Sequence, residues 1–221
     1  MSTGDRRPLV LRDLGWVRAL AERLAQRGVS PNAISVWGVL CALAAGGAWA
    51  FTGAGGALER LLWLAGAALV VLRIFANTLD GLVAVECGKG SREGMLYNEA
   101  PDRIADSALL IGAGYAHGGI PELGYLAACI ALFVSYVRIL GRLAGAASDY
   151  SGPMDKGGRV LTLIAAAVYL GLSPQAWQPA WGPAGHWGIA TLALGLIVLG
   201  GLYTAARRLR RAARQLRDRE T

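Results

Sequence analysis

Stretches of apolar residues alternate with short polar segments along most of the chain. Six of these stretches predict membrane-spanning helices, because a helix satisfies its own backbone hydrogen bonds inside a bilayer. They are residues 33–51, 58–76, 101–116, 123–143, 160–172 and 188–205. The fifth is short against the roughly 20 residues that a bilayer requires, so we expect its helix to extend at both ends. The pattern predicts an all-α membrane protein with six transmembrane helices.

A different pattern precedes the first span. Over residues 10–27, apolar positions recur at helical spacing while arginines and a glutamate take the other faces. This pattern predicts an N-terminal amphipathic helix that lies in the membrane interface or, alternatively, packs on the cytoplasmic face of the protein itself. Ser30 followed by Pro31 is typical of a helix N-cap and first helical residue, so we expect the first span to begin there.

Composition supports a bilayer-embedded chain. The 221 residues are 54% hydrophobic and only 17% charged, whereas soluble domains are nearer a quarter charged. We expect a single membrane domain over residues 1–221. It would comprise a cytoplasmic amphipathic segment (1–29), a six-helix transmembrane domain (30–206) and a basic cytoplasmic tail (207–221).

The net charge of +7 follows from this topology. With six spans, both termini fall on one side, together with two long polar loops that also carry basic residues, whereas the opposite side has only Arg60. The positive-inside bias therefore predicts an integral, multi-pass inner-membrane protein with both termini in the cytoplasm. Binding of nucleic acid is not needed to explain the charge, and the basic tail is suited to anionic membrane lipids.

The most informative polar residues lie between the second and third spans. Helical spacing places two sets of three residues on facing surfaces: Asn77, Asp80 and Ala84 in the first helix, and Asn98, Asp102 and Asp106 in the second. Ionisable groups at membrane depth tend to be functional, and oxygen ligands without His or Cys suit Mg²⁺, Mn²⁺ or Ca²⁺. Helix capping is the alternative explanation, but it explains poorly an aspartate such as Asp80 at a helix C-terminus.

The spacing of these residues resembles the signature of the CDP-alcohol phosphatidyltransferase family, Asp-x2-Asp-Gly-x2-Ala-Arg-x8-Gly-x3-Asp-x3-Asp. Asp80 and Gly81 fall on the second aspartate and first glycine, followed by Ala84 on the alanine. Gly94 falls on the second glycine and Asp102 on the fourth aspartate, with no insertion. Six spans and a cytoplasmic motif are also similar to that family.

The resemblance implies a phospholipid-synthesis transferase. It would move a phosphatidyl (substituted phosphate) group from a CDP-linked lipid donor to an acceptor alcohol and release CMP, with Mg²⁺ or Mn²⁺ as cofactor. Asp102 would be the catalytic base. The implied metal ligands are Asn77, Asp80, Asn98 and Asp102, and the substrate-binding residues are Gly81, Ala84, Gly94, Asp106, Arg138 and Arg142.

The chain departs from the signature at three positions. Asn77 and Asn98 replace the first and third aspartates, and Val85 replaces the arginine. An asparagine carbonyl oxygen still binds a hard cation, but two negative charges are missing, for which Glu86 and Glu99 are candidate substitutes. The alternative function is therefore a catalytically altered or inactive member that binds nucleotide or lipid, or partners an active relative. A small transporter is a weaker alternative, because no internal repeat supports it.

Basic residues elsewhere gave further expectations. Arg138 and Arg142, one turn apart inside the fourth span, are candidates for an acceptor or phosphate pocket. Lys156 and Arg159 are candidates for the same pocket, but snorkelling at the membrane surface is the slightly favoured interpretation for these two. Arg73, one turn before Asn77, is a candidate partner of Asp80 or of phosphate. Abundant glycine and alanine in the spans favour close helix packing and a homodimer.

Overall fold

The chain folds into a bundle of helices. The computed structural model describes residues 14–85, 94–183 and 186–218, without the side chains of residues 85 and 94–98. This part contains seven α-helices, two short 3-10 helices and no β-strand. The α-helices are α1 (Gly15–Gln26), α2 (Pro31–Ala50), α3 (Gly56–Val85), α4 (Gly94–Tyr115), α5 (Pro121–Leu143), α6 (Lys156–Leu172) and α7 (Ile189–Arg217); the 3-10 helices are η3 (Thr52–Ala54) and η4 (Gln175–Trp177).

Four segments of the described chain are long and apolar enough to cross a membrane. They are Pro31–Ala54, Gly56–Ala84, Pro121–Leu143 and Ile189–Arg217, which correspond to α2 with η3, α3, α5 and α7. These segments support an integral membrane protein. Helix α4 is long enough but carries charged residues in its first half, and α6 has only 17 residues. Six spans therefore remain a prediction, although all six expected stretches are helical.

Three helix boundaries differ from the sequence-based expectation. Helix α3 continues beyond the predicted span to Val85, and α4 begins at Gly94 with Pro101 inside it. Helix α7 runs unbroken to Arg217, so most of the predicted basic tail is the continuation of this helix. The tail is rich in Arg, Ala and Leu, which are strong helix formers and extend a helix past its apolar part.

The amphipathic segment packs on the bundle. Val17 and Ala21 of α1 are buried against apolar residues near the C-terminal end of α3, and Trp16 stacks on Phe75 with ring centroids 5.4 Å apart. Residues 10–13 of the predicted segment lie outside the described residues. The Ser30 hydroxyl accepts a hydrogen bond from the Ala33 N–H at 3.1 Å, which confirms the predicted N-cap of α2.

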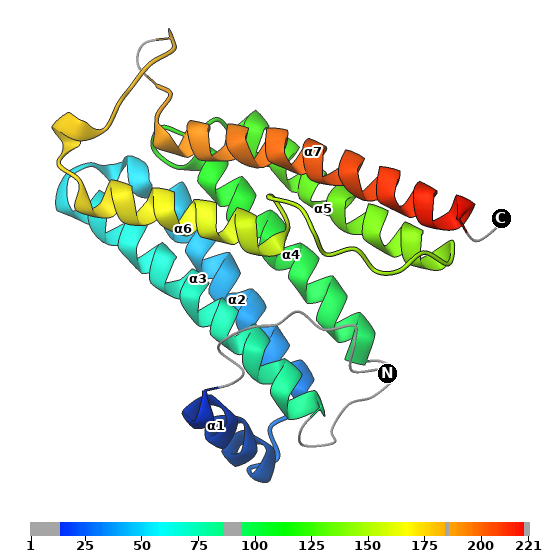
Figure 1. Cartoon of the computed structure of the whole chain (residues 1–221). Coiled ribbons are helices and arrows are strands. Elements are labelled where there is room, and N and C mark those ends of the chain that lie inside the picture. The colour runs from blue at the N-terminus through cyan, green and yellow to red at the C-terminus, as the bar shows by residue number, and fades with distance from the viewer. Residues whose placement is uncertain (1–13, 86–93, 184–185, 219–221) are drawn as a thin grey trace.

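The six longer helices run side by side (Figure 1). Helix α2 packs between α3 and α4, α6 covers α3, and α7 covers α5. Helix α1 lies beside the ends of α2 and α3 at one end of the bundle, and the loop between α6 and α7 lies at the other. The core that holds these helices is formed largely by alanine, leucine and valine, and it also contains Trp49 and Trp63.

Glycines allow α2 and α4 to touch backbone to backbone. A Cβ atom added at Gly112 would overlap the backbone of Gly46, and one added at Gly46 would overlap the carbonyl of Ala108. We expect Gly112→Ala to lower the free energy of unfolding in detergent by about 1–3 kcal/mol, the usual cost of overpacking. The matched control is Gly47→Ala, because Gly47 is in the same helix as Gly46 but has open space around it. Equal stabilities of the two variants would contradict the close approach.

Candidate active site

Polar side chains from four helices meet where the C-terminal half of α3 faces the first turn of α6. Together they form what we call the charged cluster: Ser35 of α2, Arg73, Asn77 and Asp80 of α3, Asp102 and Asp106 of α4, and Lys156 and Arg159 of α6. The α3 and α4 members are three or four residues apart, so each set lies on one helical face. The structure therefore brings Asn77 and Asp80 of one predicted face to the same pocket as Asp102 of the other.

Asp106 is a buried anion of the cluster. Its Oδ1 accepts from Arg73 Nη2 at 2.9 Å and its Oδ2 from Arg159 Nη2 at 2.7 Å. All three side chains are at most 5% exposed. Buried charges of this kind are tolerated only when they are paired and hydrogen-bonded. Asp106 thereby joins α4 to both α3 and α6.

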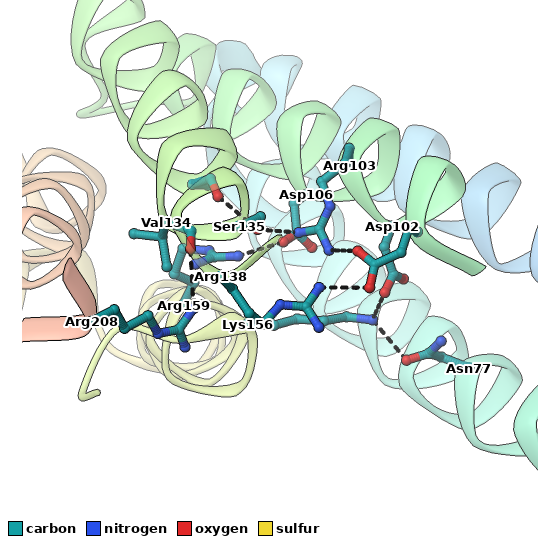
Figure 2. Close-up of polar contacts among 12 residues, drawn as sticks. Asn77, Asp102, Arg103, Asp106, Val134, Ser135, Arg138, Lys156, Arg159 and Arg208 are labelled. Atoms are coloured by element: carbon teal, nitrogen blue, oxygen red, sulfur yellow. Dashed lines mark hydrogen bonds and ion pairs between the residues drawn. The ribbon is translucent and has the colours of Figure 1, made fainter. Parts of the chain in front are cut away.

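Asp102 lies one turn before Asp106 and is bound by two cations. Lys156 Nζ donates to its Oδ2 at 2.5 Å, and Arg73 Nη2 lies 3.4 Å from its Oδ1. The same lysine ammonium donates to Asn77 Oδ1 at 2.7 Å. Figure 2 shows Lys156 reaching from α6 to both residues. Lys156 therefore links the first motif position to the proposed catalytic aspartate.

Asp80 is bound differently. Its Oδ2 accepts a 2.6 Å hydrogen bond from the Ser35 hydroxyl, while its buried Oδ1 has no hydrogen-bond partner in the described part of the chain. Asp80, Asn77 and Asp102 all line one small pocket, together with Ser35, Gly38, Val39, Arg73, Pro101 and Ala105. This pocket has a volume of about 10 Å³, which is room for one water-sized ligand.

The pocket fits a single hard cation. Its wall offers carboxylate oxygens from Asp80 and Asp102 and the carbonyl oxygen of Asn77, the donor type that Mg²⁺ and Mn²⁺ prefer. The unpartnered Oδ1 of Asp80 is the oxygen that such an ion would satisfy. Among described residues, no group of three His, Cys, Asp or Glu side chains stands ready to hold a metal. The Asn98 side chain lies outside the described residues.

Of the two interpretations of Lys156 and Arg159, the slightly favoured one, snorkelling at the surface, is wrong. Both side chains point into the cluster, and Arg159 is buried. Asp155 caps α6 by accepting from the Gly158 N–H at 2.8 Å, which places both cations in the first helical turn. The overlooked signal is electrostatic, because cations at a helix N-terminus oppose the helix dipole.

Two further expected contacts are absent from the described cluster. Arg73 binds Asp102 and Asp106, and Asp80 instead takes its hydrogen bond from Ser35. Glu99, considered as a substitute metal ligand, is hydrogen-bonded to Arg103 at 2.5 Å and to Arg138 at 2.6 Å. Its charge is thus neutralised by arginines of α4 and α5. Glu86, the other candidate substitute, lies outside the described residues.

A second group of cations surrounds the loop between α5 and α6. Arg138, besides binding Glu99, lies over the ring of Tyr150 with 4.9 Å to the centroid. Arg208 of α7 donates to the backbone carbonyls of Ser151 and Val134 at 3.0 and 3.1 Å, and Figure 2 shows it reaching toward Val134. Arg142 is exposed in the last turn of α5 and does not line the pocket.

Asp149 in this loop is held as a carboxylate. Burial alone would raise the pKa of the Asp149 carboxyl, but hydrogen bonds from Ser151 and the charges of Arg211 and Arg208 outweigh it. The pKa of Asp149 is therefore below its ordinary value. This arrangement fixes the loop that precedes Lys156 against α7.

The remaining predicted residues follow the motif along the helices. Gly81 and Ala84 are half-buried in the last turns of α3, and Gly94 is the first residue of α4. Val85 ends α3, and its side chain lies outside the described residues. In the described part of the chain, no contact tests the expected role of Gly81, Ala84 or Gly94 in substrate binding.

Comparison with known proteins gives consistent results. No protein-family model matches the chain. It is 28% identical to a phosphatidylinositol phosphate synthase of Streptomyces avermitilis over 192 residues, which are 84% of this chain and 73% of the relative. It is 30% identical to an archaetidylinositol phosphate synthase of Pyrococcus horikoshii over 152 residues, 68% of this chain and 75% of the relative.

The fold is also similar to solved structures. Crystal structures of Mycobacterium tuberculosis phosphatidylinositol phosphate synthase superpose with a TM-score of 0.66 for the form with CDP-DAG bound and 0.68 for the complex with manganese and citrate. The first is 20% identical and covers 89% of this chain and 92% of that one. The second is 21% identical and covers 89% and 88%.

The sequence relatives carry the assignment, since the solved structures are too distant in sequence to show more than the fold. The P. horikoshii synthase is 30% identical and is matched over 75% of its own length. The chain belongs to the CDP-alcohol phosphatidyltransferase family.

Proposed function

We propose that this chain transfers a phosphatidyl group from a CDP-linked lipid to an acceptor alcohol, releases CMP, and uses one divalent ion held by Asp80, Asp102 and Asn77. Asn98 is a further candidate ligand from its place in the motif. The observation that carries the proposal is the pocket, because it brings motif oxygens from α3 and α4 together beside an unpartnered carboxylate oxygen.

The proposed reaction assigns separate roles to the chain's residues. When bound, a divalent ion would neutralise charge on the diphosphate and on the departing CMP. Asp102 takes the proton of the acceptor hydroxyl, for which it must exchange one of its present partners, Lys156 or Arg73. Gly81, Ala84 and Gly94 leave space for the nucleotide, as the family resemblance implies.

Asp106 has a positioning role in this proposal. It was expected among the substrate-binding residues, but both of its carboxylate oxygens are taken by Arg73 and Arg159. Because Asp106 fixes both arginines, their guanidinium groups stay inside the charged cluster. Asp106 therefore supports the site without touching substrate.

The relatives suggest which substrates to test first. A structural neighbour binds CDP-DAG, so CDP-diacylglycerol is the first donor. The relatives are named for phosphatidylinositol phosphate, so an inositol phosphate is the first acceptor. Arg138 and Arg208 carry positive charge that suits such a phosphate. Arg142, exposed in the last turn of α5, is a further candidate to bind it.

We also propose a cytoplasmic site and a dimer. The arginine-rich continuation of α7 and the basic N-terminal segment favour a cytoplasmic location of both termini and of the cluster. Exposed apolar side chains on the outer helix surfaces are suited to lipid and to a second copy of the chain.

The function is tested by CMP release from purified protein with CDP-diacylglycerol and a series of acceptor alcohols. We expect release that requires Mg²⁺ or Mn²⁺ and stops when EDTA removes the ion. Asp80→Asn should lower the rate at least about tenfold at fixed Mn²⁺, because a carboxylate ligand becomes a neutral one. Release at background for all donors and acceptors with both metals would reject the proposal.

The same assay separates the alternative of an inactive family member. Its motivation is the pair Asn77 and Asn98 together with Val85. One variant combines the three substitutions Asn77→Asp, Asn98→Asp and Val85→Arg. If the parent releases no CMP but this triple variant does, the alternative is correct. Activity of the parent rejects it, and the naming of the relatives as synthases favours that result.

A further inference from the structure

Lys156 is a single flexible cation among rigid ones. The chain has 22 basic residues, of which only Lys89 and Lys156 are lysines. Arg73 and Arg159 of the same cluster are guanidinium groups fixed on Asp106. A lysine ammonium is a compact point charge on a flexible stem, and it is a closer match to a metal ion in its contacts than a planar guanidinium is.

The position of its ammonium group is that of a cation between motif ligands. Lys156 Nζ lies 2.5 Å from Asp102 Oδ2 and 2.7 Å from Asn77 Oδ1. These two oxygens belong to the first and fourth motif positions, and both residues line the pocket. Lys156 thus uses two of the oxygens that the proposed function assigns to a divalent ion.

The described cluster is also electrically balanced without a metal. Its three carboxylates equal its three cations in number: Arg73, Lys156 and Arg159 form ion pairs with Asp102 and Asp106, while Asp80 is hydrogen-bonded to Ser35. A divalent ion added to this set would give an excess charge of +2 in a buried region, where uncompensated charge is costly. The diphosphate of a donor brings negative charge that would offset it.

We propose that Lys156 serves as the cation of the motif in the free protein, and that a divalent ion binds firmly only together with the donor diphosphate. This inference rests on the proposed function and concerns the conditions under which the divalent ion binds to the motif residues. On joint binding, Lys156 releases Asp102, which frees that carboxylate for the ion and for the acceptor proton. Asp80, with its unpartnered oxygen, needs no such exchange.

The test measures Mn²⁺ binding to the detergent-purified chain. Bound Mn²⁺ is quantified by equilibrium dialysis and by the electron paramagnetic resonance signal of free Mn²⁺. We expect weak binding to the parent, and Lys156→Met to bind at least about tenfold more tightly because a unit charge next to the divalent ion is removed. Lys156→Arg, which keeps the charge, should stay weak. Arg210→Met, which removes an exposed charge of α7, should match the parent.

A second measurement adds CDP to the same binding assay. CDP, used as the soluble probe of the donor diphosphate, should make the parent retain Mn²⁺ beyond the amount that the same CDP concentration binds without protein. Lys156→Met should gain less from CDP than the parent, because its metal site is already open. Tight Mn²⁺ binding by the parent without CDP, or equal affinities of Lys156→Met and the parent, would overturn the proposal.

These outcomes are independent of turnover. If no acceptor supports CMP release but Lys156→Met binds Mn²⁺ more tightly, the role of Lys156 stands and the proposed function fails. If the parent releases CMP but its Mn²⁺ affinity depends neither on CDP nor on Lys156, the proposed function stands and this inference fails.

Discussion

Asp102→Asn is expected to lower the rate of CMP release at least about 100-fold, which is the usual contribution of a positioned general base. The substitution keeps the size of the side chain, so the packing of α4 should be preserved. It removes both the proton acceptor and the charge that now binds Lys156 and Arg73. The loss should fall mainly on kcat, since the donor's lipid chains and nucleotide retain their other contacts.

The matched control for this prediction is Asp218→Asn, the same chemical change at an exposed residue at the end of α7. It should leave CMP release within about twofold of the parent, as surface substitutions usually do. Thermal unfolding of both variants in detergent shows whether a loss of activity reflects a loss of fold. More than a tenth of parental kcat in a folded Asp102→Asn protein would show that another group accepts the proton.

Helix existence could be predicted from the sequence because apolar length is a local property. All six apolar stretches are helical, and the Ser30 cap is where the Ser-Pro pair indicated. Helix ends were less predictable, because α3 and α7 continue into polar segments whose residues still favour helix. Hydropathy indicates where a helix could leave the membrane, but it does not indicate where the hydrogen-bonded helical backbone ends.

The acidic half of the cluster could be predicted, because its spacing lies within two adjacent helices. Helical periodicity places Asp80 on one face of α3 and Asp102 on one face of α4, and the packing of these two helices brings both residues to one pocket. The basic half could not be predicted in the same way, since Lys156 and Arg159 come from α6 and their contacts depend on how that helix packs against α3 and α4. Pairing across distant segments is a tertiary property, and a periodic pattern in one segment does not specify its partner.

The pairing of Arg73 shows the same limit. Its position one turn before Asn77 made Asp80 a reasonable partner, because both residues belong to α3. The guanidinium instead crosses to α4 and binds Asp102 and Asp106. Two carboxylates one turn apart on a facing helix offer a cation more compensation than one carboxylate on its own helix.

Asp106→Asn is expected to lower the free energy of unfolding by about 3–5 kcal/mol, the cost of removing one partner of a buried ion pair. The variant keeps the shape of the side chain but leaves Arg73 and Arg159 buried around a neutral amide. Unfolding by SDS titration in mixed micelles measures the difference. Asp149→Asn is the control, because its partner Arg211 is 46% exposed at 3.5 Å, and an exposed pair contributes at most about 1 kcal/mol.

A second substitution identifies the cause of this expected loss. If the instability of Asp106→Asn comes from uncompensated arginines, removing one of them should restore part of the stability, so that Asp106→Asn with Arg159→Met is more stable than Asp106→Asn alone. The coupling between the two changes in a double-mutant cycle should be about 1–3 kcal/mol, as for residues in direct contact. Independent, additive losses would mean that Asp106 stabilises the bundle by packing. A loss for Asp106→Asn no larger than that for Asp149→Asn would mean that water or lipid head groups already compensate the two arginines.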